Sequence, residues 1–153
     1  MLFRSRFSTI VRNHDNKFDI QLGNAHKAED RFAHRLQRGT FELKTESYIW
    51  PRSGNIFIEA NKVGDIPTGI NVTEAEFWTH ELVTENGETI AYIVMPTHLM
   101  KDVAKNHGKL VTGAGDGGRV NGYVLPLEKL VKAFRSYGTH GIPKEENDWE
   151  FVK

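Results

Sequence analysis

The stretch TFELKTESYIWPRSGNIFIEAN, residues 40–61, decides how this chain is expected to fold. Successive side chains of a β-strand point to opposite faces of the sheet, so alternation of residue types indicates a strand. Both halves of the stretch alternate, and residues 40–48 and 55–61 therefore predict two strands. The short connection between them contains Pro51 and Gly54, which favours a hairpin.

Each predicted strand has one polar face. In the first strand, Glu42, Lys44 and Glu46 alternate with apolar or neutral residues and share one face. In the second strand, Glu59 lies on the face opposite the apolar one, which carries Ile58 and its neighbours. Carboxylates and an ammonium group are therefore expected close together on adjacent strands.

The segment before these strands predicts a helix that presents an acid among apolar residues. It begins at about Asn24, a good N-cap, and ends at about Gln37, because Gly39 supplies a stop. At 100° per residue, Glu29 projects from the middle of an apolar arc. The other members of that arc are Leu22, Ala25, Phe32, Ala33 and Leu36. The Glu29 carboxylate is therefore expected to face the core.

The rest of the chain predicts further alternation of helices and strands. Thr73, with Glu76 three residues later, forms a capping-box pattern and predicts a helix through Leu82 that includes Phe77 and Trp78. The later elements are a buried strand at 89–95, a helix opened by Thr97, a strand at 120–125 and a helix at 127–134. Additional strands are possible at 7–11 and 18–22. This order predicts a mixed α/β (α+β) fold.

Length and composition predict one globular domain. The 153 residues suffice for a single core, and we expect a domain over residues 1–138 followed by a loosely docked extension over 139–153. No apolar run approaches the roughly 20 residues that cross a bilayer. No secretory signal opens the chain, so a cytoplasmic location and no membrane partner are expected.

The cysteine count and the charge balance restrict the chemistry. With 0 cysteines, thiolate zinc sites, iron–sulfur clusters and disulfides are excluded, which leaves oxygen and imidazole as metal ligands. With 20 acidic and 20 basic residues the net charge is +0, so DNA binding requires a local basic surface.

Three carboxylates, Glu29, Glu42 and Glu59, stand where neutral residues would cost less, because an unpaired buried charge costs several kcal/mol. Mg²⁺ or Mn²⁺ held by such carboxylates keeps open positions that a phosphate can fill. Lys44 can then orient a water or neutralise developing charge. A Glu-x-Lys alternation is also common on a solvated strand face, and Arg35 can pair with Glu29, so a structural role stays open.

The helix acid, then FELKTE at 41–46, then GNIFIE at 54–59, resembles the core of PD-(D/E)XK (restriction-endonuclease-like) nucleases, especially small phage-encoded members. The similar region covers about residues 18–82. The resemblance implies an αβββαβ core with a mixed central sheet flanked by helices, and Mg²⁺- or Mn²⁺-dependent cleavage of duplex or branched DNA. It implies Glu42, Glu59 and Glu29 as metal ligands, Lys44 as the catalytic cation, and the host cytoplasm as the location.

Two alignments with that family remain open. If Glu42-Leu43-Lys44 is the (D/E)XK element, the acid expected before it is missing, since residues 31–41 contain neither Asp nor Glu. If Glu42 is the first acid, Glu59-Ala60-Asn61 is the element, with Asn61 in place of lysine and Lys44 supplying the ammonium; we prefer this alignment. Asn61 also leaves open a decayed site in a DNA-binding or accessory module.

Further candidate contacts lie outside these strands. Trp50 and Arg52, between the two strands, are candidates for contact with DNA, as is Arg119 beside a glycine-rich loop. Trp50 in a partly buried turn and a plain flexible loop are the structural alternatives. A surface around Phe77 and Trp78 is a candidate homodimer contact.

Overall fold

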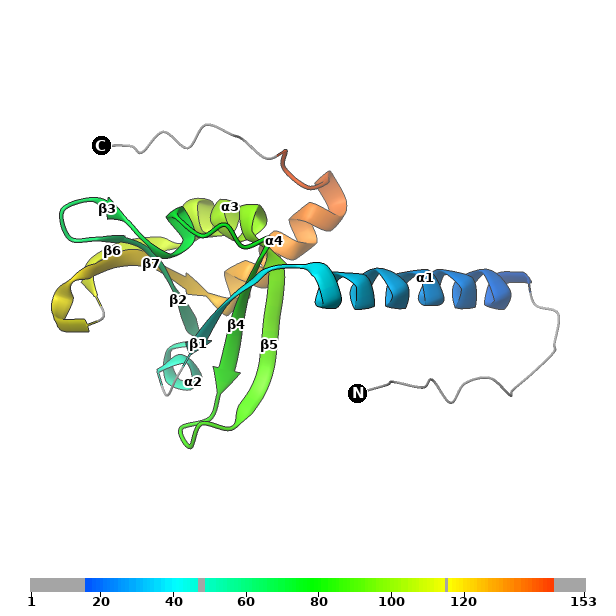
Figure 1. Cartoon of the computed structure of the whole chain (residues 1–153), viewed down its shortest axis with the longest axis horizontal. Coiled ribbons are helices and arrows are strands. Elements are labelled where there is room, and N and C mark those ends of the chain that lie inside the picture. Colours follow the sequence, from blue (N-terminus) through cyan, green and yellow to red (C-terminus); the bar gives the residue numbers. More distant parts are fainter. Residues whose placement is uncertain (1–15, 47–48, 115, 145–153) are drawn as a thin grey trace. The chain divides into compact units, whose positions relative to one another are not determined.

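The structure is a computed structural model and describes residues 16–46, 49–114 and 116–144. The chain divides into two compact units, Met1–Gly39 and Thr40–Lys153 (Figure 1). The described residues of the two units form four α-helices and two β-sheets, which is the mixed composition expected of the α+β class. None of the described helices is both long and apolar enough to cross a membrane.

The first unit contains α1, Asn16–Arg38. The predicted helix is confirmed, and it ends as expected where the Gly39 N–H donates to the Arg35 carbonyl at 2.7 Å. It begins earlier than predicted, so the possible strand at 18–22 is wrong, and the possible strand at 7–11 lies outside the described residues.

The core-facing position predicted for Glu29 is wrong. Its side chain is 70% exposed, and Phe32 and Leu36 of the same apolar arc are 59% and 55% exposed. The described part of this unit offers no second element against which the arc could pack. Helical periodicity shows which residues share a face of α1, but it does not supply a partner for that face.

The second unit contains a three-stranded sheet of β1 (Phe41–Glu46), β4 (Phe77–Val83) and β5 (Thr89–Pro96), in the order β1-β4-β5. β1 runs parallel to β4, and β4 runs antiparallel to β5. The helix predicted after Thr73 is wrong, because β4 occupies its place. The capping-box pattern is local, whereas the strand is stabilised by pairing along both of its edges.

A second, four-stranded sheet has the order β3-β2-β7-β6, with each neighbouring pair antiparallel. Its strands are β2 (Asn55–Lys62), β3 (Ile66–Pro67), β7 (Val120–Pro126) and β6 (Lys109–Ala114). β2 and β7 were predicted, and β3 and β6 were not. The predicted hairpin between β1 and β2 is wrong, since the short helix α2, Trp50–Ser53, directs the chain from one sheet to the other.

Two helices complete the second unit. α3 (Thr97–His107) contacts β4, β5 and β7, and α4 (Leu127–His140) contacts β7 and α3 (Figure 1). Both helices were predicted, and α4 continues past Gly138, where the extension was expected to begin. The core that these elements enclose includes Ile56, Ile58, Trp78, Leu82, Met95, Met100, Val103, Leu125 and Leu130.

The two faces of the β1-β4-β5 sheet differ in burial. The inner face carries the fully buried Trp78, whereas the outer face exposes large apolar residues. On that outer face Leu43 is 53%, Ile90 57% and Tyr92 58% exposed. The strand predicted at 89–95 is confirmed as β5, but the prediction that it is buried is wrong, because its outer-face side chains are exposed. Phe77 and Trp78 are themselves buried, at 6% and 0% exposure, so they do not form the exposed dimer surface that was considered.

Candidate functional site

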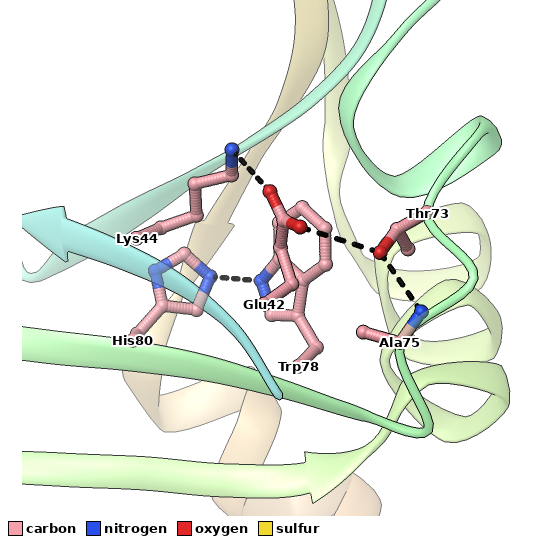
Figure 2. Close-up of polar contacts among 6 residues, drawn as sticks. All are labelled: Glu42, Lys44, Thr73, Ala75, Trp78 and His80. Atoms are coloured by element: carbon pink, nitrogen blue, oxygen red, sulfur yellow. Dashed lines mark hydrogen bonds and ion pairs between the residues drawn. The ribbon is translucent and has the colours of Figure 1, made fainter. Parts of the chain in front are cut away.

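Glu42 and Lys44 form the centre of the candidate site. They are two residues apart on β1, so they lie on the same, inner face of the strand, as predicted. The Lys44 Nζ lies 2.8 Å from the Glu42 Oε1, and each side chain is 34% exposed (Figure 2). The pair is therefore partly desolvated and still open to solvent.

Thr73 approaches the second oxygen of Glu42. Its hydroxyl donates to Glu42 Oε2 at 3.4 Å and accepts from the Ala75 N–H at 3.2 Å (Figure 2). Three residues later the segment is fixed to the residue before β1, where the Glu76 N–H donates to the Thr40 Oγ1 at 2.9 Å. The Thr73 hydroxyl thus stabilises a turn into β4, and together with Lys44 it gives both carboxylate oxygens of Glu42 a partner.

A buried polar network lies next to this pair. Trp78 and His80 of β4 are both 0% exposed, and the Trp78 Nε1 donates to the His80 Nε2 at 2.9 Å (Figure 2). The Lys44 ammonium lies 5.5 Å from the centre of the Trp78 ring, within the range of cation–π attraction. Trp78 therefore contributes to fixing the position of the ammonium group.

Glu46 continues the network on the other side of His80. Its Oε1 accepts from the Phe57 N–H at 2.8 Å and lies 3.2 Å from the His80 Nδ1, although that nitrogen makes no aligned hydrogen bond. Because the Nε2 accepts from Trp78, a neutral His80 carries its proton on Nδ1, facing the carboxylate. No pattern in the sequence indicated a functional role for His80, since the segment was predicted to be a helix.

Glu59 is half-buried on β2, which belongs to the other sheet. Its backbone packs against Gly69, where an added Cβ would lie 2.3 Å from the Glu59 carbonyl oxygen. The Asn71 Nδ2 donates to the Asn61 Oδ1 at 3.0 Å and to the Ala60 carbonyl at 3.0 Å. The segment from Gly69 to Thr73 therefore contacts Glu59 at one end and Glu42 at the other.

The three-carboxylate metal site predicted from the sequence is not brought together in the described residues. Across residues 16–46, 49–114 and 116–144, no group of three or more His, Cys, Asp or Glu side chains is placed to hold a metal. Glu29 belongs to the other unit, where its Oε2 lies 3.8 Å from the His26 Nδ1. The second unit positions Glu42 and Lys44 as a pair, with Glu59 at the far end of the connecting segment.

The three candidate DNA contacts differ in their surroundings. The Trp50 Nε1 donates to the Val83 carbonyl at 2.7 Å, and its ring packs against the core, which supports the structural alternative. Arg52 is exposed and its Nη2 lies 2.7 Å from the Glu85 Oε1. Arg119 is also exposed, and its carbonyl accepts from the Val63 N–H at 2.9 Å. Arg52 and Arg119 remain accessible to a ligand.

One carboxylate of the same sheet is held in its charged form, on the outer face. The hydroxyls of Thr89, Thr45 and Tyr92 donate to Glu81, at 2.5, 3.0 and 3.1 Å. The hydrogen bond from Thr89, followed by that from Thr45, lowers the pKa of Glu81 below its usual value. Glu81 alternates with His80 along β4, so it faces away from Glu42 and Lys44.

Comparison of the chain with protein-family models, with curated proteins and with solved structures gave no match.

Proposed function

We propose that the protein is a metal-dependent nuclease that hydrolyses DNA phosphodiester bonds, with Glu42 and Lys44 at the reacting centre. The observation that carries this proposal is the 2.8 Å pair between the Glu42 carboxylate and the Lys44 ammonium, open to solvent and beside the fully buried Trp78. A restriction-endonuclease-like core is part of the proposal. It is supported by the mixed sheet in which β1, which carries the pair, runs parallel to β4.

Stability alone is a weak reason for such a pair. Partly exposed ion pairs contribute about 0–1 kcal/mol, because the Coulomb gain is offset by desolvation and by lost side-chain freedom. Here the two charges are also oriented by neighbours, since Thr73 approaches one oxygen of Glu42 and the Trp78 ring lies near Lys44. A fixed carboxylate beside a fixed ammonium is a means of binding and polarising a phosphate.

The ligand types fit a hard divalent cation. Mg²⁺ takes oxygen ligands and is often held by one or two carboxylates, with water and substrate phosphate completing its shell. Glu42 and Glu59 would supply these carboxylates, and Glu29 as a third ligand stays a prediction. When bound, Mg²⁺ or Mn²⁺ would polarise the phosphodiester and lower the pKa of a bound water.

The chain's own residues would perform the remaining tasks. The Lys44 ammonium would orient the attacking water or stabilise the charge that develops on the phosphate oxygens. Thr73 would keep the Glu42 carboxylate in its orientation through the contact at 3.4 Å. Both roles depend on preorganised geometry, which contributes more in a partly desolvated site than in water.

A second candidate function is a DNA-binding module without catalysis. The observation that favours it is Asn61, which stands where the preferred alignment expects a lysine and accepts a hydrogen bond from Asn71 instead. In that position Asn61 stabilises the loop between β3 and β4. On this alternative, Lys44 would bind a phosphate without promoting its hydrolysis.

The test is cleavage of supercoiled plasmid, branched DNA and single-stranded DNA with Mg²⁺, Mn²⁺ or EDTA. Wild type is compared with Glu42→Gln and Lys44→Met, and the matched control is Glu74→Gln, an exposed acid in the segment before β4. We expect metal-dependent cleavage that falls at least about 100-fold in both site variants and stays unchanged in the control. Full activity in both site variants would overturn the proposal. Folded wild type that binds DNA without cutting it would instead support the second candidate.

A further inference from the structure

Helix α4 has one buried face and one basic face. Leu130 and Ala133 are each 1% exposed and anchor the helix in the core, and Leu127 and Tyr137 pack beside them. The opposite face lines a shallow hollow of the surface. We name this surface the α4 basic face; it comprises Lys132, Arg135, Ser136, Thr139 and His140.

The lysine and the arginine of the α4 basic face are not neutralised by the described part of the chain. Neither Lys132 nor Arg135 forms an ion pair with a described residue. Glu128 is the single acid in the sequence of α4, and it lies beyond ion-pair distance of Lys132 one turn later. Lys129 differs, because its Nζ donates to the His107 carbonyl at 3.2 Å.

The spacing of the α4 basic face suits an extended anion. Residues 132, 135, 136 and 139 have the i, i+3, i+4, i+7 spacing of one helical stripe, which is about 10 Å long. The guanidinium of Arg135 offers a fork of donors that matches phosphate oxygens, and Ser136 adds a hydroxyl donor. The Thr139 hydroxyl already donates to the Arg135 carbonyl at 2.9 Å, so it contributes less.

We propose that the α4 basic face binds the sugar–phosphate backbone of duplex DNA. This inference rests on the proposed function, because it assigns the surface that holds the same substrate. The chain as a whole has a net charge of +0, so long-range attraction to DNA is weak and a local set of unpaired cations has to supply the binding energy. Phosphate contacts of this kind position the duplex without reading its sequence.

The experiment measures binding separately from cleavage. Fluorescence anisotropy of a labelled duplex in EDTA is followed over a range of salt concentrations, for wild type and for the double variant Lys132→Glu/Arg135→Glu. The matched control is Lys62→Glu/Lys109→Glu, which makes the same change of net charge at two exposed lysines of the four-stranded sheet. Plasmid cleavage by each protein is assayed in parallel.

We expect the α4 variant to bind at least about 10-fold more weakly and the slope of log K against log salt to fall by about two, since each phosphate contact contributes about 0.9. The control should keep most of the affinity. Equal affinity of wild type and the α4 variant for the duplex, or an equal loss of affinity in the control, would overturn the inference. If wild type still cuts DNA in that case, the proposed nuclease function stands. Wild type that binds through α4 without cutting would overturn the nuclease and retain this surface. Wild type that does not bind the duplex would overturn the inference outright.

Discussion

Gly69 combines two constraints that each exclude a side chain. Its φ of +49° lies in the left-handed region, and an added Cβ would lie 2.3 Å from the Glu59 carbonyl oxygen. Both facts exclude a side chain, the first by conformation and the second by overlap with backbone. This glycine begins the segment whose one end packs against the Glu59 backbone and whose other end reaches Glu42 through Thr73.

Replacing Gly69 with alanine should therefore destabilise the protein more than the same change at Gly87. Gly87 also has a positive φ, +84°, but no atom lies within 4 Å of its added Cβ. Each alanine incurs the conformational penalty of about 1–2 kcal/mol, and overlap at Gly69 adds roughly 1–3 kcal/mol. Urea unfolding of both variants measures the difference. Equal losses in the free energy of unfolding would show that residue 69 does not pack tightly against the Glu59 backbone.

How far the site could be predicted depends on which residue is considered. Glu42 and Lys44 were placed on one face of a strand by two-residue alternation, a local property that survives in the fold. Glu29 was misplaced because a helical arc shows which residues could be buried together and not what buries them. Trp78 and His80 were missed, since their role follows from β4 pairing with β1, 36 residues earlier in register.

At the scale of elements, helices α3 and α4 and strands β1, β2, β5 and β7 follow from the sequence because each has a clear period and local end signals. Which strands pair with each other does not follow from the sequence. β1 and β2 are separated by a short connection that suited a hairpin, but they belong to different sheets. Pairing depends on long-range packing, which a local pattern does not encode.

The contact between α3 and α4 should make the stability of the protein fall at alkaline pH. The Tyr137 hydroxyl of α4 donates to the Asp102 Oδ2 of α3 at 2.5 Å. Burial, followed by this hydrogen bond and by the charge of Asp102, raises the pKa of Tyr137 far above its usual value. Folded Tyr137 therefore keeps its proton at pH values where the unfolded chain, with a pKa of about 10, has lost it. The stabilisation is complete below about pH 10 and is lost as the pH rises toward the folded pKa.

Tyr137→Phe should remove this part of the alkaline decline. At neutral pH the free energy of unfolding of the variant should be lower by about 1 kcal/mol. This value is at the low end of what a hydrogen bond to a charged group contributes, because the hydroxyl is partly exposed. Thermal unfolding between about pH 7 and pH 11 measures both effects. Tyr123→Phe, at a half-buried tyrosine of β7 whose hydroxyl has no hydrogen bond to a described residue, is the control. A decline of the same steepness in Tyr137→Phe and wild type would refute the assignment.

At the scale of the whole molecule, the chain consists of two units that differ in how they are stabilised. The second unit encloses a core, whereas residues 23–38 of α1 are all exposed. The apolar Phe32 and Leu36 are exposed just as the charged residues beside them are. In proteins, most of the stability of a helix comes from packing of its apolar face. Stability should therefore be uneven along the chain.

Hydrogen exchange should show this difference directly. Amides in the middle of α1 should exchange at least about 100-fold faster than those of α3, where Leu99, Met100 and Val103 are buried. Mass spectrometry or NMR on the full chain provides the measurement, with α3 as the internal reference. Slow exchange of α1, matching that of α3, would mean that its apolar arc is covered in solution.

The partly exposed outer face of the β1-β4-β5 sheet affects the thermodynamics of unfolding. Leu43, Ile90, Tyr92 and Val94 are already 53%, 57%, 58% and 43% exposed in the folded protein, so unfolding adds less new contact with water at these residues than at fully buried ones. The heat capacity of unfolding arises mainly from apolar surface that becomes hydrated for the first time. The heat-capacity increment per residue is therefore smaller than for a chain of the same length whose sheets are covered on both faces, and the stability curve against temperature is correspondingly flatter.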